Sequence, residues 1–160
     1  MKHEIYWGEG KVKELMGQWA ADQIWGDERG FANFQAMGVL IDEKPVAVII
    51  YHNYSPHEGV IEMSGAGIDK RWLNMRAVHE MFAYPFKELG CQLVVHRNDP
   101  EDKALTRMLK SWGFNFYLIP RLRGRDKPEQ ICTLTVEDWK NNRFEKRRAA
   151  RLKGKTDVKA

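Results

Sequence analysis

Apolar residues recur along the chain with two different spacings, which predict alternating helices and strands. Residues 9–25 carry them three or four positions apart, the period of one helix face, and Gly26 is a fitting end for that helix. Residues 34–41 and 45–54 predict two strands joined by a polar turn, an antiparallel hairpin. The run from Val46 to Tyr51 is apolar at every position, so we expect its strand in the middle of a covered sheet.

The rest of the chain continues this alternation. The predicted elements are a strand at 60–68, a helix at 71–89 that Pro85 should kink or restart, a strand at 92–96, a helix that begins within 98–102 and ends at Gly113, strands at 114–118 and 131–136 joined by a charged loop at 121–129, and a last helix capped near Thr135. Strands that alternate with helices in this way predict a mixed sheet covered by helices, an α/β (α+β) fold.

Composition places the chain among ordinary globular proteins. Of its 160 residues, 43% are apolar and 30% are charged, and this length favours one domain. No stretch approaches the roughly 18 apolar residues of a membrane span, and the first residues lack a signal-peptide run. We therefore expect a cytoplasmic protein without a membrane partner. Cys91 and Cys132 are expected to be reduced core thiols, and no metal site is predicted.

Positive charge is concentrated at the C-terminus. Residues 140–160 hold nine Lys or Arg and two acidic residues, a net charge of +7, while the remaining residues together carry −3. The chain is thus expected to divide into a domain at 1–139 and a basic tail at 140–160. Such a tail could bind the phosphates of a nucleic acid, or it could be a solvated helix that aids solubility.

One stretch of the chain combines features of a known family. A strand ends in the small residues Gly65-Ala66-Gly67, a helix with a basic start follows, and a later helix contains Asn98 and ends in Gly113-Phe114. This order resembles the GNAT superfamily of acyltransferases over roughly residues 30–136. The strand end Tyr51-His52-Asn53-Tyr54 is similar to that of phage and prophage members. The resemblance implies a mostly antiparallel central sheet of about six strands, with helices on both faces.

The resemblance also implies a cofactor, acetyl-CoA or another acyl-CoA, and an amine acceptor that is a protein or a small molecule. An open helix N-terminus offers N–H donors to the pyrophosphate, and a strand end of small residues lets the pantetheine arm pair with the backbone. The residues expected to bind the cofactor are Met63, Gly65, Ala66, Gly67, Lys70, Arg71, Asn74, Arg76 and Asn98.

Acyl transfer to an amine needs a base for the amine and a proton for the departing thiolate. Glu62, on the strand beside the expected thioester, is a candidate base, or else a carboxylate paired with a neighbouring cation. His52 and Tyr54 stand where family active sites open, and His52 is either a base or a hydrogen-bonded histidine at the end of the sheet. Ser64 either donates a proton to the thiolate or packs as a small residue.

The sequence also departs from the family pattern. Residues 70–76 contain no glycine, and Leu109 stands where members often have a tyrosine acid. Three functions therefore follow from the sequence: an acyl-CoA-dependent N-acyltransferase, a nucleic-acid-modifying enzyme on the same scaffold, or a binding or inhibitory protein that has lost catalysis. The basic tail and Arg121, Arg123 and Arg125 support the second of these.

Overall fold

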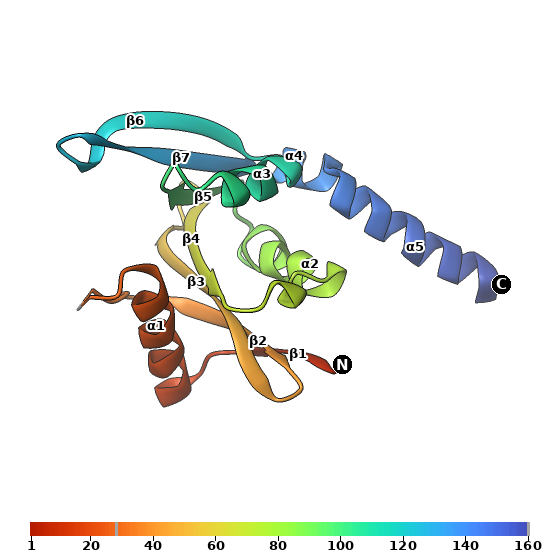
Figure 1. Ribbon diagram of the computed structural model, residues 1–160. Coiled ribbons are helices and arrows are strands. Elements are labelled where there is room, and N and C mark those ends of the chain that lie inside the picture. Colours follow the sequence, from red (N-terminus) through yellow and green to blue (C-terminus); the bar gives the residue numbers. More distant parts are fainter. Residues whose placement is uncertain (28, 160) are drawn as a thin grey trace.

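A computed structural model describes the backbone of residues 1–27 and 29–159, and the side chains as far as residue 156 (Figure 1). Within these residues a sheet of seven strands has the order β1-β2-β3-β4-β5-β7-β6. The strands are β1 (His3–Trp7), β2 (Gln35–Ile41), β3 (Lys44–Ser55), β4 (Val60–Gly67), β5 (Leu93–Asn98), β6 (Asn115–Gly124) and β7 (Lys127–Thr135). Strands β4 and β5 run parallel, and the other neighbours are antiparallel.

The helices cover the sheet and its ends. They are α1 (Gly10–Ile24), the 3-10 turn η1 (Lys70–Trp72), α2 (Met75–Ala83), the π-helical turn η2 (Tyr84–Glu88), α3 (Lys103–Ser111), α4 (Val136–Asn141) and α5 (Arg143–Lys159). Helix α1 packs on one face of β3, against Val48 and Ile50, while α2 packs on the other face, against Ile49 and Tyr51. All residues from Val46 to Tyr51 are buried, because both faces of β3 are covered (Figure 1). The predicted mixed fold with helices on both faces is confirmed.

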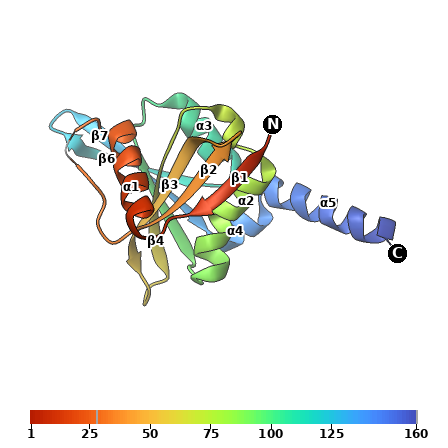
Figure 2. The same ribbon diagram turned by 90° about the horizontal axis from the view of Figure 1, so that it is seen from below.

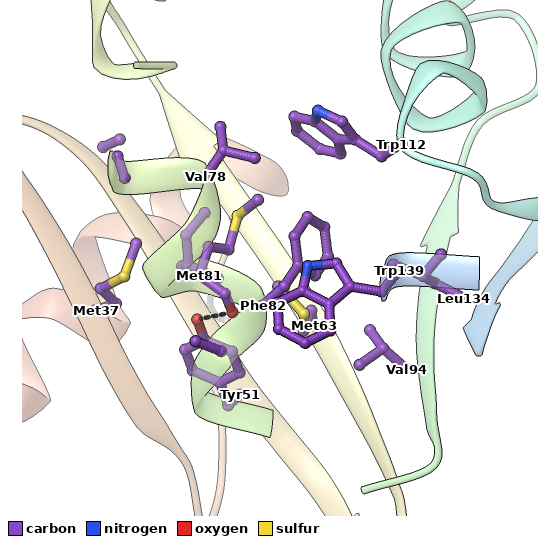
Figure 3. Close-up of a cluster of buried hydrophobic side chains, with 14 of the residues drawn as sticks. Met37, Tyr51, Met63, Val78, Met81, Phe82, Val94, Trp112, Leu134 and Trp139 are labelled. Atoms are coloured by element: carbon purple, nitrogen blue, oxygen red, sulfur yellow. Dashed lines mark hydrogen bonds between the residues drawn. The ribbon is translucent and has the colours of Figure 1, made fainter. Parts of the chain in front are cut away.

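The larger core lies between α2 and the sheet (Figure 3). Tyr51 is 1% exposed, and its hydroxyl donates to the carbonyl oxygen of Met81 at 2.6 Å, so the buried phenol does not lack a partner. Trp139 of α4 stacks on Phe86 with ring centroids 5.1 Å apart. These contacts attach α2 to β3 and α4 to η2.

One strand was missed by the sequence patterns, which predicted about six. Strand β1 pairs antiparallel with β2, from His3↔Ile41 to Trp7↔Met37, at the edge of the sheet. It spans five half-buried residues, too few to establish a period of two. Its conformation is set by pairing with β2 rather than by its own residues.

Two predicted helix starts were also wrong. The helix expected from residue 71 begins at Met75, because Asn74 is extended and its side chain accepts a hydrogen bond from the N–H of Ala77. The helix expected within 98–102 begins at Lys103, with Asp102 as its cap, because β5 continues to residue 98. The predicted disturbance at Pro85 is confirmed: α2 passes there into the π-helical turn η2.

The expected loop at 121–129 is a β-hairpin. Strands β6 and β7 continue to the pair Gly124↔Lys127, with a register shift after Ile119, and form a long hairpin that projects from the body (Figure 1). Charged residues lie along it because both of its faces are largely open to solvent near the tip. No helix in the described residues is long and apolar enough to cross a bilayer.

The C-terminal segment begins packed on the body. Thr135 caps α4 by accepting from the N–H of Asp138 at 3.0 Å, as its sequence predicted. The side chain of Asn142 donates to the carbonyl of Trp112 at 3.0 Å, and Glu145 contacts Nδ1 of His79 at 2.8 Å. Beyond this point α5 extends away from the body (Figure 2). One contact lies further along the helix, where Nη1 of Arg151 is 3.9 Å from the sulfur of Met75.

Candidate active site

The central feature of the site is a divergence between the two parallel strands. The β4–β5 ladder runs from Val60↔Leu93 to Met63↔His96 and ends there, although β4 continues to Gly67. On its other side β4 stays paired with β3 as far as Ala47↔Gly67. The last four residues of β4 thus have a strand on one side only.

The free edge of β4 presents backbone donors and acceptors. Groups of successive residues in a strand point to alternate sides. The carbonyl of Met63 points toward β5, where Nδ1 of His96 donates to it at 2.9 Å. The N–H of Ile68 points the opposite way and donates a hydrogen bond to the carbonyl oxygen of Val46 in β3 at 2.8 Å. By this alternation, the N–H and C=O groups of Gly65 and Gly67 face the side from which β5 has diverged, and an extended ligand could pair with them.

A cavity of about 620 Å³ occupies the divergence. It is bordered by Gln23 and Ile24 of α1 and also by Met81 and Phe82 of α2, which cover opposite faces of the sheet. The cavity therefore passes through the sheet at the point where the strands separate. Ser64 borders it from β4. A long, narrow ligand that enters from one face could reach a second molecule on the other.

The small residues of β4 have a packing role as well. A Cβ at Gly67 would lie 2.5 Å from Nε1 of Trp72, and a Cβ at Gly65 would lie 2.7 Å from Cδ1 of Ile49. Trp72 is buried against this strand, so the ring fills the space that a larger residue would need. Side chains of the protein already occupy the space where a Cβ of Gly65 or Gly67 would lie. The prediction that these glycines bind a ligand arm therefore concerns only their backbone N–H and C=O groups at the free edge of β4.

The predicted phosphate end lies at the start of α2. Asn74 caps the helix and satisfies the N–H of Ala77, one of the donors that a helix start leaves free. Arg71 is held by Asp69 through its Nε at 2.9 Å, and this pairing lowers the pKa of Asp69 to about 2. Lys70 borders the cavity, and Arg76 is exposed in the first turn of α2. Lys70 and Arg76 are thus the better placed cations.

A cluster of polar side chains lies on the α1 face at the ladder end. Nε2 of His52 is 2.9 Å from Oγ of Ser64 and 3.4 Å from a carboxylate oxygen of Glu62. The amide nitrogen of Asn53 donates to Glu62 at 3.2 Å and to Nδ1 of His52 at 3.3 Å. Phe31 packs edge-on against the imidazole with ring centroids 5.0 Å apart. The structure therefore brings together three of the predicted catalytic residues.

The hydrogen bonds of this cluster define the state of His52. Because Asn53 donates to Nδ1, the proton of the neutral ring is on Nε2, where it points at Ser64 and Glu62. Burial lowers the pKa of His52 below its usual 6.5, and the nearby charge of Glu62 opposes this only in part. Neutral His52 can thus orient the carboxylate of Glu62, which is left as the group able to accept a proton.

The pH dependence of catalysis should reflect the ionisation of His52 in this cluster. Arg97 and His96 also lower the pKa of His52, so we expect an acidic limb in the profile of kcat/KM with a midpoint below 6.5. Activity should fall as the pH drops through that value, because a charged imidazole beside Glu62 makes the carboxylate a poorer base. Initial rates between pH 5 and pH 9 measure the limb. Its persistence in a His52→Gln variant would assign it to another group.

Two predicted site residues lie apart from the cluster. The hydroxyl of Tyr54 is 3.5 Å from the carbonyl of Leu89, and Tyr54 borders a second cavity of about 440 Å³. Asn98 is buried, and its side-chain oxygen accepts from Sγ of Cys132 at 3.2 Å. Burial raises the pKa of Cys132 to about 11, which fits the expected core thiol. Asn98 thus stabilises the β5–β7 pair rather than bordering the cavity.

Three residues of the site were not predicted from the sequence. Asn53 and Phe31 contact His52, and His96 borders the cavity at the end of the β4–β5 ladder. Asn53 could have been suspected from its place between His52 and Tyr54. Phe31 gave no signal, because it lies in the irregular segment between α1 and β2 and reaches His52 only through the tertiary structure.

Comparison with known proteins identifies the fold. No protein-family model matches the sequence, and no curated protein is similar enough in sequence to match. Among solved structures, the N152L mutant of spermidine N-acetyltransferase SpeG from Vibrio cholerae matches with a TM-score of 0.70 and 9% identity, covering 87% of this chain and 96% of that one. The Salmonella typhimurium protein yncA, solved with its cofactor acetyl-CoA, matches with a TM-score of 0.65 and 11% identity, covering 85% of this chain and 95% of that one.

A third match comes from a GCN5-related N-acetyltransferase of Brucella melitensis. Its TM-score is 0.57 and its identity is 19%, covering 69% of this chain and 54% of that one. The chain therefore has the fold of the GNAT acetyltransferases. The resemblance read from the sequence is confirmed for the fold, and the similarity to phage and prophage members stays a prediction.

Proposed function

We propose that this protein is an N-acyltransferase that uses acetyl-CoA or a similar acyl-CoA and acylates an amine. The observation that carries the proposal is the free edge of β4 beside a cavity that passes through the sheet, with the cluster of His52, Glu62 and Ser64 on one face. The yncA structure contains acetyl-CoA, and the SpeG protein is a spermidine acetyltransferase, which supports the same class of cofactor and acceptor.

The chain's own residues supply the elements of the reaction. A bound acyl-CoA would supply an activated acyl group as a thioester. Gly65 and Gly67 offer backbone groups to its arm, and Lys70 and Arg76 offer charge to its phosphates. Glu62 takes the proton that the amine loses as the new C–N bond forms and the C–S bond breaks. The electron pair of the broken bond stays on sulfur, and the hydroxyl of Ser64, which contacts His52 and belongs to a residue that borders the cavity, is placed to protonate it. The proton that Glu62 has taken from the amine then restores the serine hydroxyl, since both side chains lie around Nε2 of His52.

Calorimetric titration with acetyl-CoA and with CoA tests the cofactor site. We expect micromolar binding, and we expect Lys70→Ala and Arg76→Ala each to weaken it about tenfold, the effect of losing one hydrogen bond to a charged group. Lys11→Ala is the matched control, because Lys11 is an exposed cation of α1 and does not border the cavity.

Two results would count against the proposal. No binding to the wild-type protein would mean that the start of α2 rejects phosphates. Binding without release of free thiol in the presence of any of a panel of amines would favour the catalytically inactive binding protein. A nucleic-acid acceptor stays a prediction, and its support is the exposed basic surface of α5 and the β6–β7 hairpin.

A further inference from the structure

His96 has a fixed tautomer at the point where β4 and β5 separate. Its Nδ1 lies 2.9 Å from the carbonyl oxygen of Met63. A carbonyl can only accept, so Nδ1 carries the proton and donates it, and in the neutral ring Nε2 keeps a lone pair. Burial lowers the pKa of His96, with smaller opposing effects of Glu62 and Glu129, which favours the neutral ring. Nε2 is therefore a hydrogen-bond acceptor.

That acceptor has no partner among the described residues. In residues 1–27 and 29–156, Nε2 of His96 and Nε1 of Trp139 are the side-chain nitrogen or oxygen atoms sealed from solvent without a hydrogen bond. A buried polar atom without a partner is unfavourable in the folded state, and native structures rarely keep one without a reason. His96 is among the residues that border the 620 Å³ cavity, so a ligand that enters the cavity and displaces the side chains covering Nε2 can supply the missing donor. Trp139 lies in the core and does not border the cavity.

The direction of the ligand follows from the proposed function, on which this inference rests. Lys70 and the start of α2 follow Gly67 in the chain, so the phosphates of CoA would lie at that end of β4. The arm would then run along the free edge from Gly67 toward Met63, and its sulfur end would arrive at His96. This end of the arm carries an amide N–H close to the sulfur and, in free CoA, a thiol.

We propose that Nε2 of His96 accepts a hydrogen bond from the sulfur end of the CoA arm and positions the thioester at the ladder end. His96 is thus a positioning residue that recognises the arm, whereas Lys70 and Arg76 recognise the phosphates. The cluster of Glu62, His52 and Ser64 lies across the sheet and is a separate set of contacts.

The variant His96→Asn separates the hydrogen bond that Nδ1 donates from the one that Nε2 would accept. An asparagine amide nitrogen reaches the position of Nδ1 and can still donate to Met63, but nothing replaces the acceptor at Nε2. We expect the dissociation constant for CoA to rise about tenfold, with that for adenosine 3′,5′-bisphosphate unchanged, because that ligand has no arm. The thermal midpoint of the ligand-free variant shows whether the fold is retained, so that a change in affinity can be assigned to the lost acceptor.

The outcomes separate this inference from the proposed function. If the wild type binds no CoA, the proposed function fails. If the wild type and His96→Asn bind CoA equally, only the role of His96 fails. Equal weakening of CoA and acetyl-CoA assigns the donor to the amide. Weakening of CoA alone would assign it to the thiol, which a thioester lacks, and would overturn the positioning role of His96. Should the variant not fold, the ¹⁵N shift of Nε2 in the wild type must move upfield on CoA binding, and a fixed shift overturns the inference.

Discussion

Replacing Glu62 by glutamine is expected to lower kcat for acyl transfer by about 100-fold or more, the range for loss of a general base. Glutamine has the same shape and can still accept from Asn53, which donates to Glu62 at 3.2 Å. It cannot take a proton from the amine, and it lacks the charge that faces Nε2 of His52 at 3.4 Å. Release of free thiol at saturating acetyl-CoA and amine measures the effect.

The control for this variant is a carboxylate on the same hairpin. Glu58 lies in the turn between β3 and β4, is exposed and accepts a hydrogen bond from the hydroxyl of Ser55. Glu58→Gln should leave kcat within about twofold, because surface substitutions of this kind change little. Binding of CoA should be the same in both variants, since neither residue borders the cavity. A kcat for Glu62→Gln within threefold of the wild type would remove Glu62 from the proposed mechanism.

Truncation of Trp139 to alanine is expected to lower the free energy of unfolding by about 3–5 kcal/mol, the range for deleting a buried aromatic side chain. Trp139 is 2% exposed and lies between Phe86, at 5.1 Å between ring centroids, and His79, at 5.8 Å. Its removal leaves a cavity where α4 meets α2 and η2 (Figure 3). The loss should lie toward the lower end of the range, because the indole N–H has no hydrogen-bond partner in the part of the chain that the structure describes.

Urea unfolding followed by circular dichroism measures the change, with Trp25→Ala as the matched substitution. Trp25 is 36% exposed and contacts Phe31 at 5.0 Å between ring centroids, so its truncation deletes the same atoms from a partly solvated position. We expect that loss to be about 1 kcal/mol or less. Similar losses for the two variants would show that α4 is not part of the cooperative core.

Local sequence patterns correctly predicted the elements whose conformation is determined by their own residues. Helix α1 ends at Ile24 because Gly26 adopts a φ of +68°, which glycine reaches without strain. Strand β3 is apolar on both faces, and Thr135 supplies its own cap to α4. The small residues that end β4 and the basic residues that follow were also visible in sequence, and their resemblance to the GNAT pattern implied the acyl-CoA site.

Other elements depend on neighbours that are distant in the chain. Strand β1 is ordered by β2, and β6 extends to Gly124 only because β7 pairs with it. Asn98 looked like a helix cap, yet β5 continues through it because β7 provides partners as far as Gln130. In each case the hydrogen bonds of a remote strand outweigh a local preference that is worth about 1 kcal/mol.

The candidate site shows the same division. The sequence by itself determined the residue types: a carboxylate and a serine two positions apart on one strand, a histidine on another, and small residues at a strand end. Their meeting depends on register, because the antiparallel pairs His52↔Glu62 and Ile50↔Ser64 put the three side chains on one face. The end of the β4–β5 ladder at Met63↔His96, and with it the cavity and the unpaired nitrogen of His96, was decided by the tertiary structure alone. Two strands far apart in sequence diverge only where the packing around them allows it, and no local pattern records that position.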